Sequence, residues 1–203
     1  MEKNDRRNNI ISTATRLFAE RGLNGVSIRE LSKAAGVSIS MISYHFGGKE
    51  GLYSSVLQEQ FSCFEDIEEI KTQISDPLIK IEDYIRWTIT RHRNNPYLLR
   101  YYTSELTNPT KYFTSLVQPA IRKVILFLIE VVEDGIAKNL FRKDLDPVDT
   151  VLAMAGMVNY YFLSMLATQD LINHSPDREE ELIRHYMDIF ARGILGCQRN
   201  STI

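Results

Sequence analysis

The chain has 203 residues, of which 44% are hydrophobic, so it can bury the core of two modest domains or of one elongated domain, which excludes a disordered or fibrous protein. Its formal net charge is −2, with eight Lys/Arg against six Asp/Glu in residues 1–60 (+2) and 16 against 20 in the remainder (−4). This asymmetry is too mild to indicate nucleic-acid binding by itself, so such a function must rest on motifs.

Cysteine usage and hydropathy exclude further classes of protein. Cys63 and Cys197 lie far apart and form no C-x-x-C motif, which argues against a disulfide framework and against a zinc site. The polar N-terminus lacks the apolar core of a signal peptide, and no apolar run is long enough to span a bilayer. We therefore expect a cytoplasmic protein with no membrane partner and no cofactor.

The first expected helix covers residues 10–22. Four apolar residues recur along one helical stripe: Ile10, Ala14, Leu17 and Phe18. Gly22 can close this helix in the left-handed conformation. The polar residues 1–9 are expected to fray, with Arg6 and Arg7 able either to touch DNA or only to keep the chain soluble.

A second helix is expected to begin after Ser27, a favourable N-cap with Glu30 at the capping-box distance. Its inward-facing residues would be Ile28, Leu31 and Ala35. The helix ends at Gly36, which can take the left-handed conformation that a tight turn needs. This arrangement is typical of the first half of a helix-turn-helix.

Ser38 is expected to cap a third short helix, on which Ile42 and Phe46 pack toward the second helix. Its other side chains would face outward or sideways: Ile39, Ser40, Met41, Ser43, Tyr44 and His45. Exposed apolar residues have no partner on a solvated helix, whereas thymine methyl groups in a DNA major groove supply one. The residues predicted to contact double-stranded DNA are Ser27, Ile28, Arg29, Ser38, Ile39, Ser40, Met41, Ser43, Tyr44, His45 and Lys49.

The rest of the chain is expected to be helical throughout. Apolar residues recur at intervals of three and four rather than two, so we expect an all-α fold. A fourth helix should run from about residue 49 to about residue 70, with an acidic cluster near its end on a solvated face. Later helices are expected at about 78–95, 97–106, 111–139, 147–170 and 177–195.

The segment from residue 151 to residue 167 is apolar on nearly all faces and carries the small residues Ala153, Ala155 and Gly156. A helix that is apolar all round must be covered on all sides. It is therefore either the central helix of the core or a helix that a second subunit covers. We expect a homodimer through the last two helices, because a symmetric pair would also read two DNA half-sites.

The chain carries no recognisable catalytic motif. Lys49 follows two glycines, but the G-x-x-x-x-G-K-[ST] pattern of a phosphate-binding loop fails at Ser43 and Glu50. The four histidines show neither H-x3-H nor HExxH spacing, and G-x-S-x-G does not occur. We therefore expect that the protein is not an enzyme.

The second half of the chain is rich in aromatic residues and Met. Most of these side chains are expected to form core. An apolar cavity with a few polar groups between the helices would still admit a flat or lipophilic small molecule, whose identity stays open. The candidate ligand-binding residues are Trp87, Arg91, His92, Tyr101, Tyr102, Glu105, Phe127, Met157, Asn159, Tyr160 and Tyr161.

The residues of the first helices combine into one longer pattern: Ile10, Ala14, Leu17, Phe18, Gly22, Ser27, Ala35, Gly36, Val37, Ser38, Tyr44, His45, Phe46 and Lys49. This pattern resembles the N-terminal DNA-binding domain of the tetracycline-repressor (TetR) family. Val26, Ser32 and Ser40 depart from the residues that the family often has. Ser43 replaces the first Tyr of a Tyr-x-His-Phe pattern, which removes one expected phosphate contact that Tyr44 could partly replace.

The resemblance implies a DNA-binding domain at residues 4–64 and a domain at residues 65–203 that binds a small-molecule effector and dimerises. It implies a sequence-specific transcriptional regulator, most often a repressor, with the fourth helix as the lever between the domains. Residues 44–53 and 95–109 are similar to the CecR-type subgroup. Two alternatives remain: a helical ligand- or protein-binding module with a non-functional DNA-binding domain, and a helical enzyme such as a dehydratase.

Overall fold

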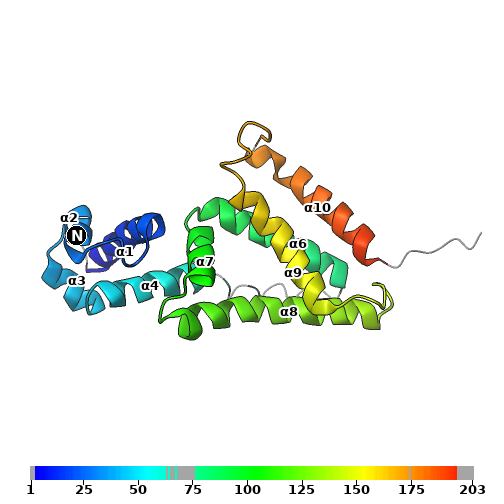
Figure 1. Cartoon of the computed structure of the whole chain (residues 1–203), viewed down its shortest axis with the longest axis horizontal. Coiled ribbons are helices and arrows are strands. Elements are labelled where there is room, and N and C mark those ends of the chain that lie inside the picture. The colour runs from blue at the N-terminus through cyan, green and yellow to red at the C-terminus, as the bar shows by residue number, and fades with distance from the viewer. Residues whose placement is uncertain (1–2, 63, 65–66, 68–75, 174, 196–203) are drawn as a thin grey trace, which may run out of the picture. The chain divides into compact units, whose positions relative to one another are not determined.

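The computed structural model of the chain describes residues 3–62, 64, 67, 76–173 and 175–195. This part of the chain is helical and contains no strand, apart from an isolated antiparallel bridge between Phe141 and Leu195 (Figure 1). The predicted all-α fold is confirmed. Among the described residues, no helix combines the length and the hydropathy that crossing a bilayer requires.

The described residues divide into two compact units. The first unit combines the helices up to Phe64 with residues 95–120, and the second contains the remaining residues. Residues 95–120 follow the first helix of the second unit in sequence but pack with the N-terminal helices. The predicted functional division into residues 4–64 and 65–203 stays a prediction.

Four helices form the part of the first unit that we call the head. They are α1 (Lys3–Arg21), α2 (Ile28–Ala35), α3 (Ile39–Phe46) and α4 (Lys49–Ser62). Apart from Ile28, the predicted inward-facing side chains of α1, α2 and α3 form the core of the head, and Ala14, Leu31 and Ile42 are at most 1% exposed. Burying a Leu or Ile side chain contributes about 1.5–3 kcal/mol to folding.

Helix α1 begins at Lys3, so the prediction that residues 1–9 fray is wrong for the described residues from Lys3 onward. Asp5 in the first turn interacts favourably with the helix dipole. Asn9 fixes the middle of the helix, because its side-chain amide donates to the Ala35 carbonyl at 2.9 Å. Polar composition alone could not reveal that contact.

The first unit is completed by helix α7 (Leu98–Thr107) and by the short π-helix η2 (Phe113–Val117), which both pack against α4. Helix α8 (Gln118–Ala137) follows η2 directly, so Pro119 stands at the start of this long helix.

The second unit is built from α6 (Pro77–Asn94), the rest of α8, α9 (Pro147–Leu163) and α10 (Glu179–Ile194), with the short helix η3 (Pro176–Arg178) before α10. Helix α6 packs against α9 and α10, which also contact each other. Two ion pairs join α6 to the acidic first turn of α10. Arg93 contacts Glu179 at 3.0 Å, and Arg86 binds Glu180.

The starts of α1 and α8 and the end of α9 differ from the predicted ones, since α8 begins at Gln118 rather than near residue 111. The described part of α4 ends at Ser62, and the predicted acidic cluster at Glu65, Asp66, Glu68 and Glu69 lies outside the described residues. Helix α9 ends at Leu163 rather than near residue 170. The hydroxyl groups of Ser164 and Thr168 donate to the carbonyls of Tyr161 and Ser164, and such bonds compete with the helical pattern.

Candidate nucleic-acid interface

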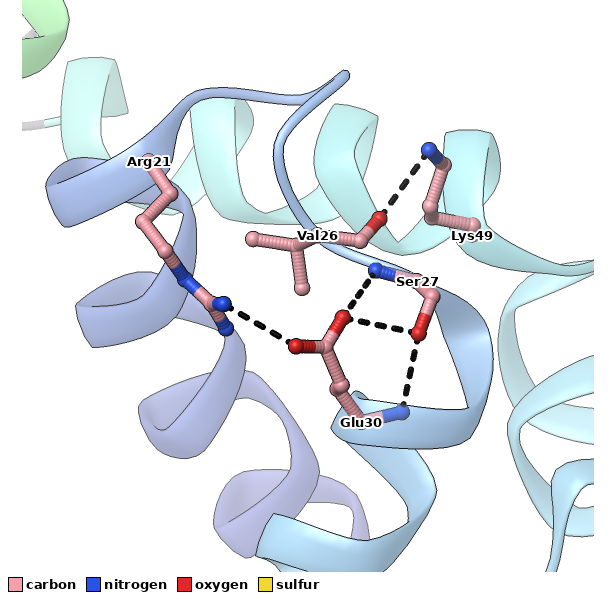
Figure 2. Close-up of polar contacts among 5 residues, drawn as sticks. All are labelled: Arg21, Val26, Ser27, Glu30 and Lys49. Atoms are coloured by element: carbon pink, nitrogen blue, oxygen red, sulfur yellow. Dashed lines mark hydrogen bonds and ion pairs between the residues drawn. The ribbon is translucent and has the colours of Figure 1, made fainter.

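The predicted capping box at the start of α2 is present (Figure 2). The Ser27 hydroxyl accepts a hydrogen bond from the Glu30 amide at 3.2 Å, while the Glu30 carboxylate accepts from the Ser27 amide and hydroxyl at 2.8 Å each. Arg21 at the end of α1 donates to the other oxygen of this carboxylate at 2.9 Å. The cap therefore ties α1 to α2 as well as starting α2.

These contacts shift the pKa of Glu30. Hydrogen bonds from the Ser27 backbone and side chain, followed by the bond from Arg21, lower this pKa from 4.5 to about 2. The carboxylate is therefore ionised in the folded protein at any pH above about 2, and its negative charge lies favourably near the N-terminus of α2.

The lowered pKa of Glu30 predicts a pH effect on stability. Below pH about 4.5 the unfolded chain takes up a proton that the folded chain does not, so the stability that Glu30 contributes is lost as the pH falls toward about 2. Thermal melts of the wild type and of Glu30→Gln should therefore differ most near neutral pH and converge toward about pH 3. A difference that stayed constant over this range would contradict the assignment.

The turn between α2 and α3 has the predicted glycine geometry. Gly36 is left-handed, with φ of 65°, and the following Val37 amide donates to the Ser32 carbonyl at 3.0 Å. Ser38 then caps α3, since its hydroxyl accepts from the Met41 amide at 3.2 Å. These contacts fix the direction in which α3 leaves the turn.

Helix α3 presents the predicted face. Ile42 and Phe46 are buried, whereas Ile39 is 39% and Tyr44 is 74% exposed. Ser40 and Ser43 are also exposed, and Met41 and His45 are half-buried. Arg29, on α2, is exposed as well, and Ile28 beside it is half-buried rather than fully inward. A hydroxyl-rich face with exposed Ile and Tyr matches the acceptors and methyl groups of a major groove.

Lys49 has a structural role that the sequence did not indicate. Its ammonium group donates to the Leu23 carbonyl at 3.0 Å. It also donates to the Val26 carbonyl at 3.1 Å, as Figure 2 shows. These carbonyls belong to the loop between α1 and α2, so Lys49 ties that loop to the first turn of α4. An ammonium has three N–H donors, so this geometry leaves capacity for the predicted phosphate contact.

The basic N-terminal residues also acquire defined positions. The Arg7 guanidinium lies over the Phe46 ring at 5.5 Å from its centroid, where it covers the end of α3.

The predicted ligand-binding residues belong to different units. Tyr101 and Glu105 are buried in the first unit, where the Tyr101 hydroxyl donates to the Thr15 carbonyl at 2.8 Å. Tyr102, half-buried, lies in the same unit. The residues that fall in the second unit are Trp87, Arg91, His92, Phe127, Met157, Asn159, Tyr160 and Tyr161. The predicted ligand-binding set therefore spans both units and stays a prediction.

Within the second unit, a polar contact joins two residues of this set, His92 and Asn159. The two side chains are joined by a 2.8 Å hydrogen bond, and the Asn159 amide nitrogen donates to the Ala155 carbonyl at 2.9 Å. Asn159 thus offers its oxygen to His92, which must carry its proton on Nε2. Burial lowers the pKa of His92, and its Nδ1 atom has no hydrogen-bond partner among the described residues.

Metal chemistry receives no support from the described residues, where no group of three or more His, Cys, Asp or Glu could hold an ion. Cys63, Cys197 and His174 lie outside the part that the structure describes.

A tight turn between two capped helices, the second of which presents an exposed face, defines a helix-turn-helix DNA-binding protein. Residues 10–56 match the family model of bacterial regulatory proteins of the tetR family, and residues 77–191 match that of the tetracyclin repressor-like C-terminal domain. The chain belongs to the TetR family of transcriptional regulators.

Relatives with curated names support this assignment. The transcriptional repressor NicS of Pseudomonas putida is 25% identical over 158 residues, which cover 76% of this chain and 74% of that protein. The transcriptional repressor KstR2 of Mycobacterium tuberculosis is 24% identical over 152 residues, covering 73% of this chain and 74% of that protein. Both names describe transcriptional repressors of the helix-turn-helix type.

Solved structures confirm the fold. The ketosteroid transcriptional regulator KstR2 of Mycobacterium tuberculosis superposes with a TM-score of 0.77 at 19% identity, covering 96% of this chain and 97% of that chain. The TetR family regulator PfmR of Thermus thermophilus superposes with a TM-score of 0.75 at 20% identity, covering 95% and 97%. At these identities the likeness concerns the fold alone.

Proposed function

We propose that the protein is a homodimeric repressor in the cytoplasm that binds operator DNA through α3 and leaves it when a small-molecule effector binds. The observation that carries this proposal is the exposed face of α3, which Ser38 caps at its start and the left-handed Gly47 caps at its end. Family membership and the names of the relatives support it. The alternative of a non-functional DNA-binding domain is not favoured, because the capping and turn geometry of the head is intact.

The contacts with DNA divide into two kinds. Tyr44, His45 and Lys49 are proposed to bind phosphates, which supply affinity without reading sequence. Ile39, Ser40 and Met41 on the first turn of α3 are proposed to reach base edges together with Ser43. The Ser27 hydroxyl already serves the capping box, so any phosphate contact at this position would come in addition to that role.

Met41 provides the test of base reading. Met41→Ala should weaken binding to the preferred operator by about 5- to 100-fold while leaving affinity for random DNA within about twofold, because losing one specific contact costs about 1–3 kcal/mol. Competition titrations against both DNAs measure the ratio. Equal losses on both would show that Met41 does not read bases.

The proposed dimer interface uses α9 and α10. Val148, Leu152, Gly156, Tyr160 and Leu163 recur at helical spacing on the exposed side of α9. Leu152 is 51% and Tyr160 is 69% exposed, which is unusual for large apolar residues on a single face. A Cβ atom added at Gly156 would meet nothing within 4 Å, so a partner helix could approach closely there.

The effector is proposed to bind in the second unit. The aromatic residues there favour a flat or lipophilic molecule, and the buried Nδ1 of His92 offers an acceptor for a hydrogen-bond donor on the ligand. The narrower similarity to CecR-type regulators also stays a proposal.

A mobility-shift assay with DNA from upstream of the chain's own coding sequence tests the function. We expect a shift whose dissociation constant rises steeply with salt. If the protein gives no salt-sensitive shift at any concentration at which it stays dissolved, this result would favour the ligand- or protein-binding module instead.

A further inference from the structure

A buried carboxylate joins α7 to the head. Glu105 of α7 is fully buried, and its Oε1 atom accepts a hydrogen bond from the Tyr53 hydroxyl of α4 at 2.7 Å. Its Oε2 atom accepts from the Thr110 amide at 3.1 Å, and the Thr110 hydroxyl donates to both oxygens at 3.0 and 3.1 Å. Donors therefore surround the carboxylate group on both oxygens.

Tyr53 is the centre of this contact on the α4 side. Its side chain is 2% exposed, and its ring packs edge-on against Phe18 of α1 at 5.1 Å between centroids. The same ring lies 6.2 Å from Tyr101 and 6.3 Å from Tyr112. Burial, followed by the hydrogen bond to Glu105, raises the pKa of Tyr53, so its hydroxyl remains a donor at every physiological pH.

Further polar contacts join α4 to the residues on either side of α7. The Tyr112 hydroxyl donates to the Glu50 carbonyl in the first turn of α4 at 3.2 Å, and Lys111 forms an ion pair with the Glu50 carboxylate. Toward the other end of α4, the Asn95 amide donates to the Gln60 side chain at 2.8 Å. Residues 95–112 thus contact α4 from its first turn to Gln60.

A buried, directional network specifies geometry more than it adds stability. An apolar residue at position 105 could fill the same space, but it would not select one orientation of α4. Only Gly47 and Gly48 separate the end of α3 from the start of α4. Lys49, the first residue of α4, also holds the loop before α2. The orientation of α4 on residues 97–117 therefore sets the orientation of α3, the proposed recognition helix.

We propose that Glu105 is a positioning residue for DNA binding, which holds α4 and the recognition helix on residues 97–117 through the Tyr53 hydroxyl. This inference rests on the proposed function, because it assumes that α3 binds DNA. It gives residues 97–117, which lie within the C-terminal family match, a role in presenting the head. A head fixed in advance loses less conformational freedom on binding, so loosening it weakens binding.

The test compares Tyr53→Phe and Glu105→Gln in the full-length chain. Phenylalanine keeps the ring packing and removes the hydroxyl donor. Glutamine keeps the shape of the side chain, but an NH2 group replaces one carboxylate oxygen. This group cannot accept the hydrogen bonds that the oxygen accepted, so one donor is left unsatisfied. The matched control is Thr107→Ala on the same helix, because the Thr107 hydroxyl is exposed and bonds to its own helix at the Thr103 carbonyl.

Affinity for operator DNA is measured at a temperature at which circular dichroism shows each variant fully folded. We expect the dissociation constant to rise about five- to tenfold for each single variant, no further for the double variant, and not at all for the control. Amide hydrogen exchange in α4 should rise in the same variants while exchange in α2 stays unchanged.

A purely structural role for Glu105 would lower the melting temperature and leave the dissociation constant of the folded variants within twofold of the wild type, which would overturn the inference. Additive losses in the double variant would overturn it too, because the two residues would then act independently. If the wild-type chain showed no salt-sensitive DNA binding, the proposed function itself would fail, and this inference with it.

Discussion

Replacing Lys49 with alanine is expected to lower the free energy of unfolding by about 2–4 kcal/mol and to weaken operator binding by about tenfold or more. The substitution leaves the carbonyls of Leu23 and Val26 without their charged donor, and hydrogen bonds from a charged group contribute about 1.5–3 kcal/mol each. The loop before α2 would then lose its tie to α4. Chemical denaturation and DNA titration measure the two effects.

The salt dependence of binding separates the two roles of Lys49. If the side chain also meets a phosphate, the slope of log affinity against log salt should become shallower by about 0.9 in the alanine variant. The control is Lys143→Ala, since Lys143 is an exposed lysine of the second unit. An unchanged slope would limit Lys49 to its structural role, and unchanged stability would contradict the role described here.

Leu152→Glu is expected to raise the dissociation constant of the homodimer about 100-fold or more. The substitution places a carboxylate in the middle of the exposed apolar face of α9, and an unpaired charge buried at an interface costs several kcal/mol. A monomer can occupy only one half-site, so binding to a two-half-site operator should fall with dimerisation. Sedimentation velocity and DNA titration follow both quantities.

Helix α8 supplies a matched control for this variant. Leu126 is 48% exposed, nearly the same as Leu152 at 51%, but it lies on a helix outside the proposed interface. Leu126→Glu should therefore leave the dimer intact. If the two variants had the same dimer dissociation constant, the interface would lie elsewhere or the protein would not be a dimer.

Local sequence signals predicted the head well, because its decisive contacts are short in range. The capping box joins Ser27 to Glu30 across three positions, and Gly36 supplies a backbone conformation that most other residues resist. The inward positions Ile42 and Phe46 follow from helical spacing alone. Tertiary contacts nevertheless extended α1 beyond the predicted start, since Asn9 is fixed by the Ala35 carbonyl, 26 positions away.

Long-range side-chain contacts, in contrast, could not be predicted from local sequence signals. The sequence offers Glu105 only as a candidate polar group of a ligand site. It does not indicate the hydrogen bond to Tyr53, which lies 52 positions away and carries no motif that marks the pair. Lys49 likewise reaches carbonyls 23 and 26 positions back. Side-chain contacts over such separations depend on the packing of whole helices, which periodicity predicts only as buried or exposed.

The most direct measurement of the central claim is methylation protection of guanine N7 on an operator that the full-length chain selects from random DNA. If α3 of each subunit enters the major groove, we expect two protected patches there, related by twofold symmetry and separated by about 10 base pairs or a multiple of that distance. A single patch without symmetry, or protection confined to the minor groove, would contradict the entry of α3 from two subunits.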